Sequence, residues 1–157
     1  MERRFTVSQT VSVEVKMDVP ISRLQDLLIS AFEGAWKFDP AKVKVIRSNY
    51  WYRINEFGKP NGKPETWPNR TDKENIYKHV DYPANPGGYV MVEDIEGGEK
   101  KVYRLDLDAM KKGLEVMSKL EKNKGGHHIH NFLEENDDAE TGDVYLQCCL
   151  FGEIIYG

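Results

Sequence analysis

The sequence predicts an α+β fold in which helices pack on one face of a mostly antiparallel sheet. Three observations support this fold class. An alternating apolar pattern, typical of a half-buried strand, opens the chain; amphipathic helical patterns follow; and a Gly-Gly pair separates two strand patterns as in a hairpin. The 157 residues fit a single domain, residues 1–157, long enough to bury a core without staples.

The N-terminal part of the chain predicts a strand, a helix, a second strand and a loop. Apolar residues alternate with polar ones over 5–19, which indicates a long strand. Residues 20–34 begin with proline, end with glycine and carry apolar residues at helical spacing. Residues 41–57 are rich in β-branched and aromatic types and predict one long strand. Residues 58–70 contain prolines and glycines and predict a long loop.

The C-terminal part predicts a hairpin followed by helices. After a short helical turn within 75–88, residues 89–94 and 101–105 form the hairpin strands. Asp106 is a good N-cap for a helix that Gly125 and Gly126 end. A short helix follows within 127–136. Thr141 is the expected N-cap of a last helix, for which a buried strand is the rival, and residues 153–157 favour a short strand.

Composition excludes several classes of protein. The net charge of -4 argues against binding bulk nucleic acid, and no apolar run is long enough to cross a membrane. The N-terminus lacks the continuous apolar stretch of a signal peptide, so we expect a cytoplasmic protein without a membrane partner. Cys148 and Cys149 are adjacent within an apolar run, which indicates reduced, buried thiols rather than a catalytic pair.

An aromatic segment is the strongest candidate for a ligand site. Aromatic rings beside arginine, serine and asparagine suit a planar, phosphorylated ligand, because rings stack and guanidinium groups hold phosphate. The candidate ligand-binding residues are Arg47, Ser48, Asn49, Tyr50, Trp51, Tyr52, Arg53 and, from the loop, Trp67. The alternative is that these rings belong to the core or to an interface between subunits.

Acidic residues and histidines form two further candidate sites. Residues 134–143 carry six carboxylates, of which Asp137, Asp138, Glu140 and Asp143 are candidates for binding a basic patch of a partner. The alternative is a solvated loop that leads into a helix. Three histidines lie within 127–130, and His128 and His130 are weak candidates for metal ligands. Their spacing matches no metal motif, so we expect no metal and no cofactor.

The segments "LLISAFEG", "SNYWYRI", "YPANPGG" and "FLEENDDAETGDVYLQCCLFGEIIYG" carry a resemblance that covers nearly the whole chain. The chain resembles a widespread family of small, uncharacterised bacteriophage and prophage proteins. The resemblance implies a phage origin and brings no established activity. Small accessory phage proteins often counter host defence, either by sequestering a nucleotide signal or by blocking a host protein.

Three functions are therefore expected in descending order. The first is counter-defence by sequestering a nucleotide-like signal in the cytoplasm of the infected host, without catalysis. The second is inhibition of a host defence enzyme by direct protein contact. The third is a small nucleotide-acting hydrolase, which ranks last because the sequence contains no complete catalytic set. The dense aromatic residues also predict a homo-oligomer.

Overall fold

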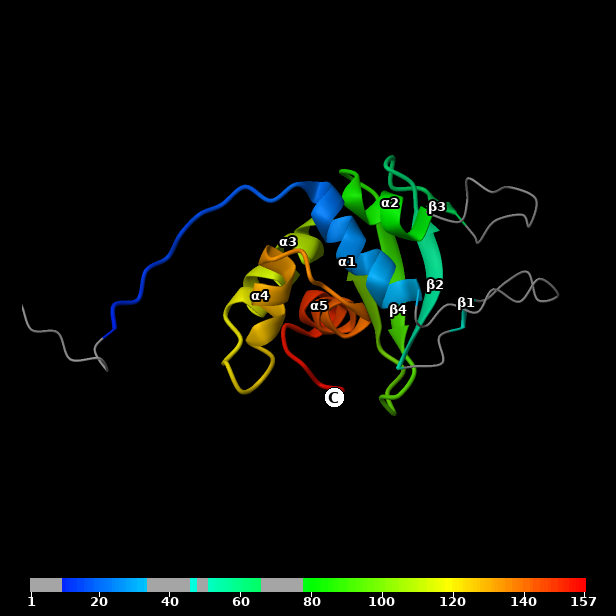
Figure 1. Ribbon diagram of the computed structural model, residues 1–157. Helices are drawn as coiled ribbons and strands as arrows, with labels where there is room; N and C mark the ends of the chain where they lie inside the picture. Colours follow the sequence, from blue (N-terminus) through cyan, green and yellow to red (C-terminus); the bar gives the residue numbers. More distant parts are fainter. Residues whose placement is uncertain (1–9, 34–45, 48–50, 66–77) are drawn as a thin grey trace, which may run out of the picture.

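The computed structural model describes residues 10–33, 46–47, 51–65 and 78–157 (Figure 1). Within them the fold is α+β, as predicted, with helices packed against an antiparallel sheet. The elements in chain order are α1 (Ile21–Glu33), β1 (Ile46–Arg47), β2 (Tyr52–Gly58), β3 (Pro64–Glu65), α2 (Lys78–Ala84), β4 (Tyr89–Asp94), β5 (Val102–Leu105), α3 (Leu107–Ser118), α4 (His127–Leu133) and α5 (Ala139–Phe151).

The sheet has the order β1-β2-β4-β5, and β3 pairs with the far end of β2. Strands β4 and β5 form the predicted hairpin, closed by a bend at 95–100. Ile54 lies opposite Val92 across β2 and β4, and Val90 lies opposite Leu105 across β4 and β5. All four side chains are buried in the hydrophobic core, so β2, β4 and β5 form the sheet side of this core.

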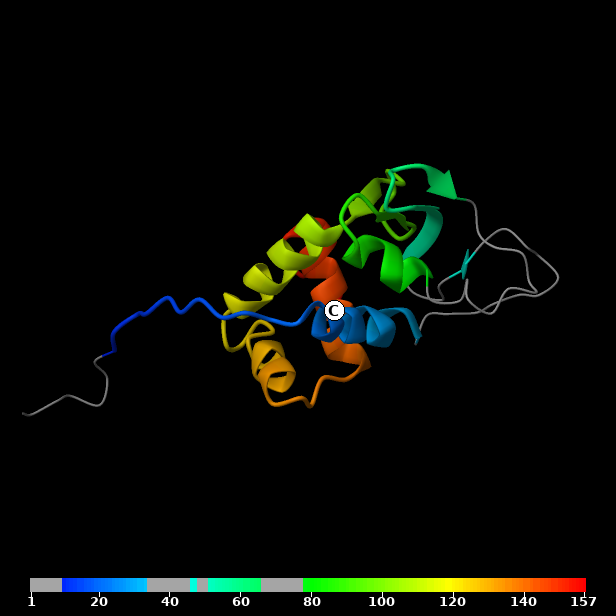
Figure 2. The same ribbon diagram turned by 90° about the horizontal axis from the view of Figure 1, so that it is seen from above.

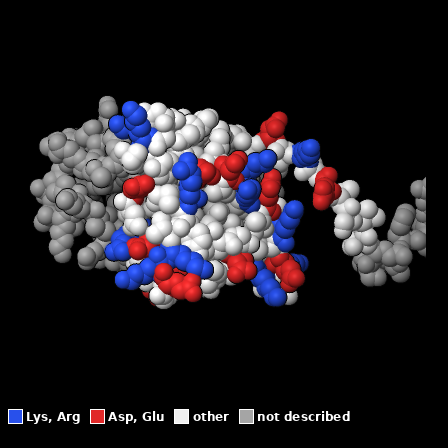
Figure 3. Space-filling model, turned by 180° about the vertical axis from the view of Figure 1, so that it is seen from behind, with Lys and Arg blue, Asp and Glu red and all other residues white. Residues whose placement is uncertain are grey.

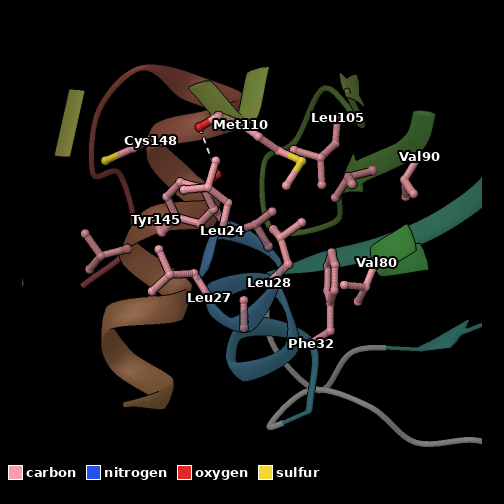
Figure 4. Packing of buried hydrophobic residues seen from close by; sticks show 14 of the residues in the cluster. Leu24, Leu27, Leu28, Phe32, Val80, Val90, Leu105, Met110, Tyr145 and Cys148 are labelled. Carbon is pink, nitrogen blue, oxygen red and sulfur yellow. Dashed lines mark hydrogen bonds between the residues drawn. The ribbon is translucent and has the colours of Figure 1, made fainter. Parts of the chain in front are cut away.

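The helices build the other half of the core. Helix α5 packs against both α1 and α3, and α2 packs on β4 (Figures 1 and 2). Leu27 and Leu28 of α1 are fully buried. The hydroxyl of Tyr145 on α5 donates to the backbone oxygen of Met110 on α3 at 2.8 Å (Figure 4). This buried hydrogen bond fixes α5 against α3.

Capping residues set where two of the helices begin. Asp106 caps α3 as predicted, because its side chain accepts a hydrogen bond from the backbone N–H of Ala109. The predicted cap of α5 is wrong by three positions: Asp138, not Thr141, is the N-cap. Its carboxylate accepts the backbone N–H of Thr141 at 2.9 Å. The helix ends at Gly152, whose φ of 71° lies in the left-handed region that glycine tolerates.

The predicted first strand is wrong for the part that the structure describes. Residues 10–19 form no strand, and this N-terminal segment extends away from the body in both ribbon views (Figures 1 and 2). Residues 5–9 lie outside the described residues. The alternation of apolar residues is real, but a strand needs a neighbour for its backbone hydrogen bonds, and no described strand pairs with this segment.

Three further predictions about the elements need correction. Residues 41–57 are not one strand, because β1 and β2 run antiparallel, with Arg47 opposite Arg53. The loop predicted at 58–70 contains β3, which pairs with the end of β2. Residues 153–157 form no strand. Residue types indicate extended backbone, but they cannot show where the chain reverses or which strands meet.

No described helix has both the length and the apolar character needed to cross a bilayer. On the face seen from behind, acidic and basic side chains are interspersed rather than segregated (Figure 3). That face therefore carries no extended surface of one charge that would attract a polyanion.

Candidate functional site

Trp51 and Tyr52 lie in the core. Trp51 is 5% exposed and Tyr52 is 2% exposed. The indole of Trp51 stacks on Tyr156, with ring centroids 5.4 Å apart, and also contacts Phe151. The hydroxyl of Tyr52 donates to the backbone oxygen of Ala31 at 2.7 Å. The core interpretation of these two rings is therefore the one that the geometry favours, since neither ring presents an open face for a ligand.

Of the two arginines in the aromatic segment, Arg53 forms an ion pair within the sheet. Arg53 is half-buried and donates from Nε to Glu93 at 2.7 Å, and its Nη2 contacts the same carboxylate. The guanidinium of Arg53, which was predicted to hold phosphate, is therefore already paired with the carboxylate of Glu93. Arg47 lies in β1, and its side chain is outside the described residues. The remaining candidates, Ser48, Asn49, Tyr50 and Trp67, also lie outside the described residues, so their role stays a prediction.

Three of the six carboxylates of the acidic run are engaged within the molecule. Asp137 accepts a hydrogen bond from Arg23 of α1 at 2.9 Å, and this contact is the main reason that the pKa of Arg23 is raised. Asp138 caps α5, and Asp143 accepts the indole N–H of Trp51 at 2.8 Å. Glu140 differs, because its side chain is 74% exposed. Of the four predicted partner-binding residues, Asp138 and Glu140 are exposed, and the carboxylate of Asp138 is engaged in capping α5.

Trp51 and the C-terminal part of the chain, from Asp143 to Tyr156, meet in one hydrogen-bond network. Asp143 joins Trp51 to Gln147, whose Nε2 donates to the other carboxylate oxygen at 2.8 Å. The Oε1 atom of Gln147 accepts the backbone N–H groups of Ile155 and Tyr156, which fixes the C-terminal segment. Gln147 is fully buried, so the network has a structural role in this fold.

The network ends on the hairpin that joins β4 to β5. The hydroxyl of Tyr156 donates to the carboxylate of Asp94, and this hydrogen bond is the main reason that the pKa of Tyr156 rises to about 12. Asp94 also accepts the backbone N–H groups of Glu96 and Gly97. Sequence reasoning missed Asp94, Gln147 and Tyr156, because their separation along the chain leaves no pattern to find.

Two histidines of α4 lie beside one carboxylate of the acidic run, and the sequence analysis did not predict this pairing. His127 and His128, at the start of α4, lie beside Glu140 in the first turn of α5, and one ligand atom from each lies within 4.8 Å of the others. His128 is 3% exposed, whereas His127 and Glu140 face solvent. His130, the other predicted candidate, is exposed on α4 and is not in this group. No linear spacing could have paired His127 with Glu140, since they belong to different helices.

A chain of hydrogen bonds orients the buried histidine. The Nδ1 atom of His128 lies 2.9 Å from the hydroxyl of Thr141. The backbone N–H of Thr141 donates to Asp138, and hydrogen bonding from Thr141 lowers the pKa of that carboxyl. The contact with Thr141 engages Nδ1 of His128 and leaves Nε2 as the other ring nitrogen. Burial first, and then the neighbouring His127, lower the pKa of His128, so the ring is neutral at pH 7.

Both cysteines are free thiols, as predicted, and Cys148 is buried as predicted whereas Cys149 is half-buried. Burial raises the pKa of Cys148 to about 11, and burial is also the largest influence raising the pKa of Cys149. Neither thiol has the thiolate character that a nucleophile needs at neutral pH. The geometry therefore does not support cysteine-based catalysis at these two residues.

The N-terminal segment exposes a row of apolar side chains. Residues 10–18, here called the N-terminal arm, are all exposed. The apolar side chains Val11, Val13 and Val15 are 84%, 79% and 82% exposed, and Met17 is 61% exposed. They occupy alternate positions, which places them on one face when the backbone is extended. The arm therefore presents a continuous apolar row to solvent.

In comparisons with known proteins, no family model, no curated protein and no solved structure matches the chain.

Proposed function

We propose that this protein acts by binding another protein, and that the N-terminal arm makes the contact. The observation that carries the proposal is the row of Val11, Val13, Val15 and Met17, each more than half exposed. Large apolar side chains in a contiguous row on a surface mark an interaction site, because water is displaced when a partner covers them. Polar residues on the alternate positions of the arm remain in solvent.

The mode of binding follows from the alternation. An extended segment with a period of two is suited to join the edge of a sheet, where its backbone groups complete the hydrogen bonds of the edge strand. Its apolar face then covers the core side of the partner's sheet. Because the arm is extended in Figure 1 and none of its side chains belongs to the core, it docks without rearranging the body of the protein.

The partner is a different protein rather than a second copy of this chain. Strand β5, at the end of the described strand order, has 4 residues and spans about 13 Å, whereas an extended arm of residues 10–18 spans about 30 Å. Two arms paired with each other form only a two-stranded ribbon, which is marginally stable in water. A longer edge strand on another protein accommodates the whole row.

The resemblance to phage proteins supports a biological class for this partner. It is a host protein of antiviral defence, and binding inhibits it. The nucleotide-sequestering function stays an alternative prediction that depends on Arg47, Ser48, Asn49, Tyr50 and Trp67. It is less well supported, because Trp51 and Tyr52 are enclosed in the core and Arg53 is paired with Glu93.

The test compares two faces of the arm. Val11→Ser/Val13→Ser/Val15→Ser removes the apolar row, and Ser12→Ala/Glu14→Ala/Lys16→Ala changes the opposite face as a matched control. Both variants should melt at the wild-type temperature, because these side chains make no core contact. We expect the wild type and the control to capture the same host protein, and the valine variant to lose it. With the purified partner, hydrogen exchange should slow at alternate amides of the arm, as in an added edge strand.

Two results contradict the proposal. One is a valine variant that still captures the partner with wild-type affinity. The other is a wild-type dimer in sedimentation that the valine variant converts to a monomer, which assigns the arm to self-association. A thermal-shift panel of host signal nucleotides tests the alternative: a shift that is retained in the valine variant favours nucleotide sequestration.

A further inference from the structure

We propose that His127, His128 and Glu140 form a zinc-binding site at the junction of α4 and α5. Their ligand atoms lie within 4.8 Å of one another, which is close enough to converge on one ion after small side-chain rotations. The site is separate from the N-terminal arm in sequence, and it does not depend on the arm binding a partner.

The buried member of the site is already oriented as a metal ligand. His128 is 3% exposed, and its Nδ1 is held 2.9 Å from the hydroxyl of Thr141. Because Nδ1 is engaged with Thr141, Nε2 is the ring nitrogen left for an ion, and the tautomer that binds a metal carries its proton on Nδ1, where Thr141 accepts it. Metal-binding histidines typically use one ring nitrogen for the ion and the other for such a hydrogen bond, and this partner fixes the ring.

The Nε2 atom of His128 lies near the carboxylate of Glu140, and the ring of His127 is adjacent. Nε2 of His128 lies 4.0 Å from Oε1 of Glu140, which is too long for a hydrogen bond. The ring of His127 lies with its centroid 3.9 Å from that of His128. Two ligand atoms bound tetrahedrally to zinc lie about 3.3 Å apart, given zinc–ligand distances of about 2.0–2.1 Å. The side chains that must move, His127 and Glu140, are the two exposed ones, so closing the site does not disturb the core.

The ligand set selects the class of metal. Two imidazoles and one carboxylate suit zinc, whereas magnesium and calcium prefer sites built from oxygen atoms alone. Three protein ligands leave a fourth position for water, and the exposure of His127 and Glu140 places that position towards solvent. A bound ion ties the start of α4 to the start of α5, whose N-cap Asp138 belongs to the same chain of hydrogen bonds.

The test uses the full chain without a histidine tag, freed of metal by a chelator and titrated with zinc against a chromophoric competitor. We expect one zinc per chain and an increase in melting temperature, because the ion binds only the folded state. His127→Ala and Glu140→Gln should each weaken binding by roughly tenfold or more. Both residues are exposed, so both variants should fold as the wild type does.

Matched controls lie on the same helix and in the same acidic run. His130→Ala removes an exposed imidazole of α4, and Glu134→Gln removes an exposed carboxylate. Neither belongs to the site, so both should bind zinc with wild-type affinity. In NMR spectra, zinc should shift the ring signals of His127 and His128 and leave those of His130 in place.

The positioning role of Thr141 has its own readout. Thr141→Ser retains the hydroxyl and should keep most of the zinc affinity, whereas Thr141→Val loses it and should weaken binding by roughly tenfold or more. The assignment is overturned if the wild type binds no zinc, if affinity is unchanged in His127→Ala or Glu140→Gln, or if His130→Ala weakens binding as much as His127→Ala does.

Discussion

Replacing Trp51 by phenylalanine tests whether this residue is part of the core or a platform for a ligand. The substitution keeps an aromatic ring and removes the indole N–H that donates to Asp143 at 2.8 Å. A hydrogen bond to a charged group contributes about 1.5–3 kcal/mol. The smaller ring also loses part of its stacking on Tyr156, an aromatic pair of a kind that contributes about 0.5–1.5 kcal/mol.

Together these losses lower the free energy of unfolding by about 2–4 kcal/mol. For a chain of this size, that corresponds to a melting temperature lower by about 4–16 °C. The assay is urea denaturation followed by circular dichroism, with thermal melts as a second measurement. An exposed ligand platform predicts a different result, because surface substitutions usually change stability by less than about 0.5 kcal/mol.

A double-mutant cycle isolates the hydrogen bond from the loss of ring area. The variants are Trp51→Phe, Asp143→Ala and the two combined, and we expect a coupling energy of about 1–2 kcal/mol. Tyr103→Phe is the matched control, since its ring also packs on Phe151, and it should change stability by less than about 0.5 kcal/mol. A coupling energy below about 0.5 kcal/mol, within the error of additivity, refutes the assigned role of the Trp51–Asp143 contact.

Two other predictions concern α5. A Cβ atom at Gly142 would lie 2.7 Å from the backbone N of Ala31, and one at Gly113 would lie 2.2 Å from Sγ of Cys149. Helix propensity alone predicts that alanine stabilises either position by about 1 kcal/mol, but we expect each substitution to destabilise by about 1–3 kcal/mol in urea denaturation. Gly98→Ala, where a Cβ meets open space, should be nearly neutral, and a stabilised Gly142→Ala contradicts the close packing of α5 on α1. The second prediction concerns pH: hydrogen bonds from Thr141 hold the pKa of Asp138 below its value of 3.8 in the unfolded chain. This contribution to stability is present above pH 3.8 and is lost as the pH falls through the lower, folded-state pKa. Asp138→Asn retains a good N-cap without the titration, so its melting temperature should fall less steeply in acid, and parallel curves contradict this reasoning.

Much of the secondary structure was predictable because its causes are local. The helical spacing that follows Pro20, the N-cap at Asp106 and the Gly-Gly turn of the hairpin each act within a few residues. The α+β class followed from the order of these elements and is confirmed. The cap at Asp138 was missed because two residues with capping side chains, Asp138 and Thr141, compete at the start of α5.

The candidate sites were harder to predict, because side chains that look reactive were also suited to structural roles. Trp51 and Asp143 were assigned to different sites, yet they form a hydrogen bond with each other although 92 positions of the chain separate them. The sequence analysis considered the histidines of 127–130 with each other, whereas the geometry brings His127 and His128 to Glu140. In each case the pairing depends on how α5 packs, and no local pattern encodes that packing.

The sequence by itself determined the helices, the central hairpin and the alternating character of the N-terminal arm, since periodicity and capping are properties of neighbouring residues. It also determined that the arm has a strand-like apolar face. Only the tertiary structure decided that the arm has no neighbour among the described strands, that Trp51 is enclosed, and that His128 points towards Glu140. The physical reason is that burial and long-range hydrogen bonds depend on which surfaces meet, and this is settled only when the whole chain packs.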